Sequence, residues 1–99
     1  MIVVKRVEFE EKIKTNEELK NFLLDKQPVT FYYRRRVVWN SEDDYPTFLY
    51  YNGEFIAHFI RKTEDITEFL KGIGIESPEN LDIEVINLDS LIGTVEYYS

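Results

Sequence analysis

Three carboxylates late in the sequence have the types and spacing that a metal-dependent hydrolase could use. Asp82 and Glu84 alternate along a predicted strand, so both lie on one face of it, and Asp89 follows closely enough to approach them. Carboxylates in such an arrangement can hold divalent cations that activate water. No lysine follows in register and no second cluster of this kind occurs, so a metal-dependent hydrolase or nuclease is the alternative hypothesis and not the first one.

The other residues that could do chemistry lack the partners that it needs. His58 is the one histidine and is expected in mid-strand opposite Thr47, with no nucleophile or orienting acid beside it. The acidic run 42–44 lacks the spaced ligands and the glycine of a calcium loop. The sequence contains no cysteine, no glycine-rich phosphate loop and no serine-hydrolase motif. We therefore expect no cofactor, and catalysis is the minority hypothesis.

The charge of the chain favours a protein partner. The formal net charge is -7, a sign that repels phosphate backbones and makes direct binding of nucleic acid unfavourable. A partner with a basic surface fits this charge, and an acidic mimic of nucleic acid is a further alternative. No apolar run approaches the roughly 18 residues of a membrane span, and we expect a cytoplasmic protein.

Arginines and tyrosines supply the candidate contact residues. The run Arg34-Arg35-Arg36 stands on a predicted strand, where consecutive side chains point to opposite faces and cannot form one patch. These arginines either pair with Asp and Glu or recognise an anion, and the sequence leaves both possibilities open. Tyrosine combines contact area with a hydroxyl group, as protein interfaces favour. The candidate interaction residues are Tyr32, Arg34, Arg36, Tyr51, Tyr97 and Tyr98.

Hydrophobic periodicity predicts two helices and six strands. The helices are expected over residues 16–26, with Thr15 as N-cap, and 64–71, with Thr63 as N-cap. Alternation and β-branched or aromatic density predict strands over residues 2–13, 29–39, 48–51, 54–60, 81–86 and 94–98. The order β-α-β-β-β-α-β-β predicts one α+β domain over residues 1–99, with both helices packed on a mixed or antiparallel sheet.

Asn52-Gly53 between two apolar runs predicts a two-residue hairpin turn with positive φ at both positions. Such a turn pairs Tyr51 with Glu54 and Tyr50 with Phe55. Strict alternation then divides the hairpin into two faces. One face is expected to carry Phe48, Tyr50, Phe55, Ala57 and Phe59, and the other Leu49, Ile56 and Ile60. Because both faces are apolar, we expect the hairpin to be central or covered twice, with Phe48, Phe55 and Phe69 contributing to the core.

Two resemblances to known proteins accompany these patterns. Residues 46–71, from Pro46-Thr47 through Asn52-Gly53-Glu54 to Phe69-Leu70, locally resemble the last third of thioredoxin, without its Cys-x-x-Cys pair and therefore without its activity. The short, cysteine-free, Tyr- and Ile-rich chain, with Val95-Glu96-Tyr97-Tyr98 near its end, also resembles small proteins of filamentous viruses of hyperthermophilic archaea. That resemblance implies an unusual fold, high thermal stability and a role inside an infected cell. We therefore expect a viral or mobile-element accessory protein that binds another protein, and a homodimer formed through a sheet edge fits this expectation.

Overall fold

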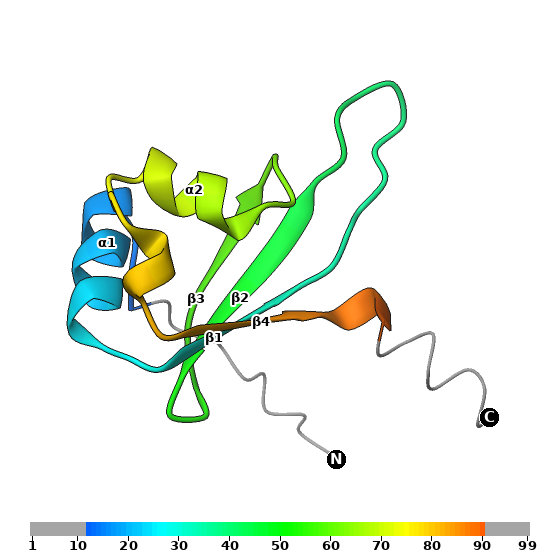
Figure 1. Ribbon diagram of the computed structural model, residues 1–99. Helices are drawn as coiled ribbons and strands as arrows, with labels where there is room; N and C mark the ends of the chain where they lie inside the picture. The colour runs from blue at the N-terminus through cyan, green and yellow to red at the C-terminus, as the bar shows by residue number, and fades with distance from the viewer. Residues whose placement is uncertain (1–11, 91–99) are drawn as a thin grey trace, which may run out of the picture.

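The computed structural model describes residues 12–90 of the 99-residue chain as an α+β fold. Figure 1 shows both helices on one side of a single sheet. The predicted strands over 2–13 and 94–98 lie outside the described residues, apart from Lys12 and Ile13. The elements are α1 (Asn16–Asp25), β1 (Val29–Tyr33), β2 (Tyr45–Tyr51), β3 (Glu54–Arg61), α2 (Ile66–Gly72), a 3-10 turn (Pro78–Asn80) and β4 (Ile83–Asn87).

The sheet has the strand order β3-β2-β1-β4 and is mixed, which confirms one of the two predicted sheet types. β2 pairs antiparallel with both β1 and β3, whereas β4 pairs parallel with β1. The parallel pair aligns Val29 with Ile83 and Tyr33 with Asn87. This pairing brings the segment after α2 alongside the strand that follows α1.

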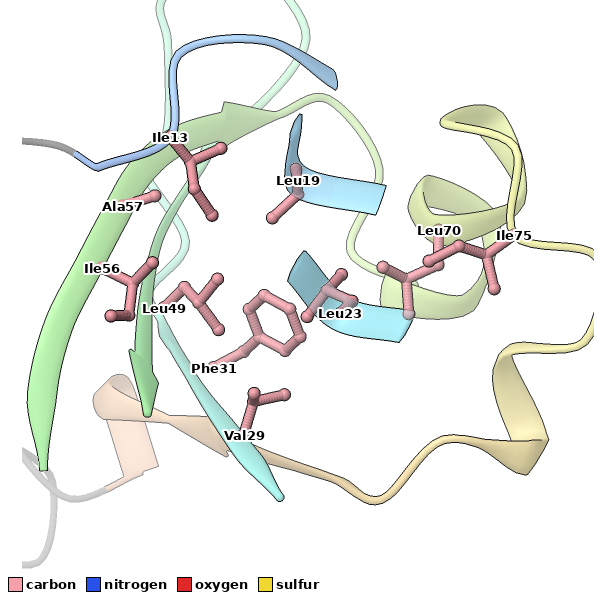
Figure 2. Packing of buried hydrophobic residues seen from close by; sticks show 10 residues of the cluster. All are labelled: Ile13, Leu19, Leu23, Val29, Phe31, Leu49, Ile56, Ala57, Leu70 and Ile75. Atoms are coloured by element: carbon pink, nitrogen blue, oxygen red, sulfur yellow. The ribbon is translucent and has the colours of Figure 1, made fainter. Parts of the chain in front are cut away.

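The core lies between the helices and one face of the sheet. Leu19 and Leu23 of α1 and Leu70 of α2 are buried against side chains of β1, β2 and β3, as Figure 2 shows. The three leucines belong to the apolar stripes that the sequence predicts for the helices. The strand side of this core consists of Val29, Phe31, Leu49, Ile56 and Ala57.

Local capping agrees with the sequence for α1 and differs for α2. Thr15 is the N-cap of α1, and its hydroxyl group accepts from the Glu18 N–H at 3.1 Å. The predicted N-cap Thr63 of the second helix is wrong, because α2 begins at Ile66 with Asp65 as its N-cap. The carbonyl oxygens of Thr63 and Glu64 accept from the Arg61 guanidinium, and the Asp65 carboxylate caps the helix by accepting from the Thr67 N–H.

The hairpin turn is as predicted, but its two faces are not. Asn52 and Gly53 have φ values of 52° and 75°, and Tyr50 pairs with Phe55. A bulge between Leu49 and Tyr50 then shifts the register, so the parity of β3 changes beyond it. Three facing assignments are therefore wrong: Ala57 and Phe59 lie on the helix side, and Ile60 lies on the open side. For the same reason His58 lies opposite Phe48 and not opposite Thr47.

The long second strand is shorter than predicted. Pairing in β1 ends at Tyr33, and beyond it a single bridge joins Arg36 to Asp44. Residues 34–44, here called the arm, stand out beyond the end of the sheet in Figure 1. Val37 and Trp39 have the parity of the buried Phe31, yet no described element covers them and both are exposed.

Replacing Gly53 with valine is expected to lower the free energy of unfolding by about 1–2 kcal/mol, because a β-branched residue is strained at positive φ. A Cβ at this position meets no atom within 4 Å, so the loss comes from backbone conformation alone. Gly72→Ala is the matched control, because Gly72 lies in α2 with equally open space around it and alanine favours a helix. Equal urea midpoints for the two variants would contradict the turn assignment.

Candidate functional site

The sheet face opposite the helices carries a row of aromatic side chains. This aromatic face consists of Tyr32, Phe48, Tyr50, Phe55 and His58. The rings of Tyr32 and Tyr50 meet edge to face at 5.3 Å, and Tyr50 meets Phe55 in the same way at 5.8 Å. His58 stacks on Phe48 at 4.8 Å. No helix within residues 12–90 packs on this face.

A groove of about 860 Å³ runs along the aromatic face. We call it the aromatic groove. Its floor comes from β1 and β2, one end is bounded by Pro28 and the hairpin turn, and its rim comes from the β4 region. The lining residues are Pro28, Val29, Thr30, Tyr32, Phe48, Tyr50, Asn52, Gly53, Asp82, Glu84 and Leu88. The groove thus combines an aromatic floor with a carboxylate edge. Aromatic side chains with a few polar groups are typical of binding pockets.

The backbone that carries the two rim carboxylates is hydrogen-bonded to neighbouring segments. The Asp82 N–H donates to Gln27 Oε1 at 2.7 Å, and the Asp82 carbonyl accepts from the Val29 N–H at 3.2 Å. Glu84 lies beside Thr30 in the β1–β4 register. Both carboxylates are exposed, and neither forms an ion pair with any residue in the range 12–90. They therefore give the groove a negative edge that is free to meet a cation.

The three carboxylates of the enzyme alternative are not assembled into a metal site. Asp82 and Glu84 do share the rim, as the alternation predicts. Asp89 instead accepts from the Arg35 N–H at 2.9 Å, at the base of the arm. Among the described residues, no group of three or more His, Cys, Asp or Glu side chains is placed to hold a metal ion.

Ion pairs brace the arm. Arg35 pairs with Asp43 at 2.5 Å, Arg36 pairs with Asp44 at 2.5 Å, and Lys62 of the chain after β3 also pairs with Asp44. Lys62 and then Arg36 hold the pKa of the Asp44 carboxyl below its ordinary value. The Asp43 carboxylate likewise raises the pKa of Arg35. Two of the three consecutive arginines thus have a structural role in the arm.

Arg34 differs from its two neighbours. It is exposed, and its guanidinium forms no ion pair with any described residue. Its backbone is fixed, because the Arg34 N–H donates to the Pro46 carbonyl at 3.2 Å. Arg34 therefore offers an unpaired cation from a fixed backbone position at the base of the arm.

A buried arginine supports the junction between the sheet and α2, and the sequence pattern did not reveal it. Arg61 is only 1% exposed and donates to Thr47 Oγ1 at 2.8 Å and to the carbonyl oxygens of Thr63 and Glu64 at 3.0 and 2.7 Å. Its guanidinium lies 4.9 Å from the centre of the Tyr33 ring, within the range of a cation–π contact. Burial lowers the pKa of Arg61 from its ordinary value.

Tyr33 connects this arginine to a carboxylate. The Tyr33 hydroxyl group donates to Glu64 Oε1 at 3.1 Å. Burial, followed by that hydrogen bond, raises the pKa of Tyr33 above its ordinary value. A lone arginine at the end of an apolar strand gives no sequence signal of such a network, because its partners are backbone carbonyls and rings.

The predicted interaction residues are distributed over several parts of the molecule. Tyr32 lines the aromatic groove, and Arg34 and Arg36 lie on the arm. Tyr51 lies on the helix side, where its ring meets Phe22 edge to face at 5.8 Å. Tyr97 and Tyr98 are outside the described residues. Tyr50, which is not one of those six residues, occupies the floor of the groove, because the hairpin register places it on the open face.

Comparisons of the chain with protein-family models, with curated proteins and with solved structures each gave no match. Within residues 12–90, the helices are also too short or too polar to cross a membrane.

Proposed function

We propose that this chain is a non-enzymatic binding protein that holds a basic segment of another protein in the aromatic groove. The observation that carries the proposal is the groove itself, in which Tyr32, Phe48 and Tyr50 lie beside two carboxylates without ion-pair partners among residues 12–90. A partner segment with alternating apolar and basic residues fits it, because its apolar side chains meet the floor and its cations meet the rim.

The physical properties of the groove suit protein recognition. Tyr32 and Tyr50 each have few rotatable bonds, and their edge-to-face contact holds both rings in place before binding. Ordering them on binding therefore costs little entropy. The net charge of -7 increases the rate at which a basic partner arrives, whereas Asp82 and Glu84 align it over the floor.

The cellular setting is part of the same proposal. The resemblance to small proteins of filamentous archaeal viruses is the ground for placing the chain among viral or mobile-element accessory proteins. In that setting the chain acts in the host cytoplasm, and a host or viral protein with a basic surface is its partner. This part of the proposal depends on composition, whereas the binding proposal depends on the groove.

The binding proposal is tested with two synthetic peptides that alternate leucine with lysine or leucine with glutamate. We expect the lysine peptide to shift the amide resonances of Tyr32, Tyr50 and Glu84 in labelled protein and to bind more weakly as salt rises. The glutamate peptide should leave these resonances unchanged. Glu84→Lys should lower the affinity for the lysine peptide about tenfold, equivalent to about 1.4 kcal/mol of binding free energy.

Leu24→Ala is the matched control, because Leu24 is an exposed apolar residue of α1 away from the groove. This variant should bind the lysine peptide as the wild type does. Resonance shifts confined to other surfaces, or equal binding of both peptides, would contradict the proposal. A metal-dependent hydrolysis of nucleic acid that disappears in Asp82→Asn would favour the enzyme alternative instead.

A further inference from the structure

The chain enters the described structure beside the hairpin turn. The Lys12 N–H donates to the Ile56 carbonyl at 3.1 Å, and the Lys12 ammonium group pairs with Glu54. The next residues, 13–16, line a cavity of about 320 Å³ together with residues 57–60. The chain therefore runs here in the same direction as β3, and the residues before Lys12 lead to it from the end of the sheet where the hairpin turn lies.

The aromatic groove lies at the same end of the sheet. Both residues of the hairpin turn line it. One row of residues crosses all four strands there, because Tyr50 pairs with Phe55 on one side and with Thr30 on the other. Thr30 in turn lies beside Glu84. A segment that crosses this row from Lys12 therefore meets the aromatic rings first and the carboxylate rim last.

We propose that residues 3–9, here called the N-terminal segment, cross the aromatic groove of their own molecule with Lys5 at the carboxylate rim. Adjacent strands lie about 4.8 Å apart, so the path from Lys12 at the β3 edge to Glu84 is about 19 Å. Seven extended residues span about 23 Å. Lys5 therefore reaches Glu84 with enough chain left to turn onto the open face.

The alternation of the N-terminal segment matches the groove. Every second side chain of an extended segment points to the same face. One face carries Lys5, Val7 and Phe9, and the other carries Arg6, Glu8 and Glu10. Two apolar side chains thus meet the aromatic floor, and a cation meets two carboxylates that have no ion-pair partner among residues 12–90. The two acids point to solvent and do not meet the rim.

The opposite end of the chain is a poorer occupant of the groove. Residues 91–99 contain one glutamate and no lysine or arginine, so they bring no cation to the rim. The N-terminal segment also has a high effective concentration at the groove, because it is tethered at Lys12. A partner protein must displace it before binding. This regulation rests on the proposed function, because the segment and the partner compete for one groove.

A spin label tests the placement of the N-terminal segment directly. The chain has no cysteine, so Glu8→Cys provides a single labelling site on the solvent face of the segment. We expect the label to broaden the amide resonances of Thr30, Tyr50 and Glu84. The amide of Ser41 should stay sharp, because the arm lies at the opposite end of the sheet from the hairpin turn in Figure 1.

Two results of this experiment would overturn the proposal. The first is that all three groove amides stay sharp. The second comes from mixing spin-labelled chains with isotope-labelled chains that carry no spin label. Equal broadening in that mixture would make a second copy the occupant, whereas occupation within one molecule gives no broadening there.

Peptide affinity tests the regulation. Lys5→Glu should raise the affinity for the lysine peptide about tenfold, because the rim repels the new carboxylate and the groove is open in a larger fraction of the molecules. Arg6→Glu is the matched control, since it makes the same change of charge on the solvent face of the segment. Its effect should be clearly smaller. Equal affinities of the two variants would contradict the regulation.

The placement of the segment and the proposed function can fail separately. If the label broadens the groove amides but neither peptide binds to Lys5→Glu, the proposed function is contradicted and the N-terminal segment stays assigned to the groove. If the groove amides stay sharp but the lysine peptide binds, the segment is not the occupant and the proposed function stands.

Discussion

Replacing Phe31 with alanine is expected to lower the free energy of unfolding by about 3–5 kcal/mol, because it opens a cavity in the centre of the core. The Phe31 side chain is completely buried, and its ring meets that of Phe59 edge to face at 6.1 Å. Figure 2 shows it between the strands and Leu23 of α1. Urea denaturation of the variant measures the loss directly.

Phe48→Ala is the matched control for this variant. Phe48 is half-buried and lies on the open face, where its ring stacks on His58. Its removal leaves no enclosed cavity, so we expect a clearly smaller loss than for Phe31. Equal losses would contradict the assignment of the two faces. The sequence pattern had placed Phe48 in the core, and the structure corrects this.

Replacing Arg61 with alanine is expected to lower the free energy of unfolding by about 3–5 kcal/mol. The substitution opens a cavity and removes the donors of three buried or partly buried acceptors. Lysine is not a conservative replacement. Arg61→Lys keeps a buried positive charge but loses the planar group that reaches Thr47, Thr63 and Glu64 together. We therefore expect Arg61→Lys to be strongly destabilised as well.

Arg61→Met separates the cost of the charge from the value of the hydrogen bonds. Methionine has a similar length and fills the space of the arginine stem without a charge to desolvate. One terminal nitrogen of Arg61 is buried without a partner in the described structure, so part of the desolvation penalty is not offset. Arg61→Met should thus be more stable than Arg61→Lys in urea. The reverse order would show that the charge itself is needed.

Local patterns predicted much of the fold. The stripes of α1 and α2, the Thr15 cap and the Asn52-Gly53 turn all depend on residues within a few positions of one another. The bulge after Leu49 has no such local signal, because alternation looks the same on both sides of it. One extra residue was enough to reverse the predicted faces of Ala57, Phe59 and Ile60.

The candidate site could be predicted only in part. Alternation correctly placed Asp82 and Glu84 on one face, and Tyr32 was among the predicted contact residues. Their meeting in one groove depends on the parallel pairing of β4 with β1, which joins segments separated by more than half of the chain. The end of β1 at Tyr33 could not be predicted either, because the β-branched and aromatic pattern of β1 continues into the arm. No described helix covers the arm, and the sequence pattern gives no sign of that.

In the sheet of residues 12–90, β4 is an edge strand. The groove should therefore open more easily on its β4 side than on the side of the β2–β3 hairpin. Among these residues, β4 is hydrogen-bonded to the sheet through β1 alone, and bringing the two together closes a long loop at a large cost in entropy. Amides of β4 should therefore exchange with solvent through openings that leave the β2–β3 hairpin intact. Each such opening moves Asp82 and Glu84 away from Tyr32 and Tyr50. An occupant that touches both sides of the groove thus acts as a clamp, because it binds only while β4 is closed.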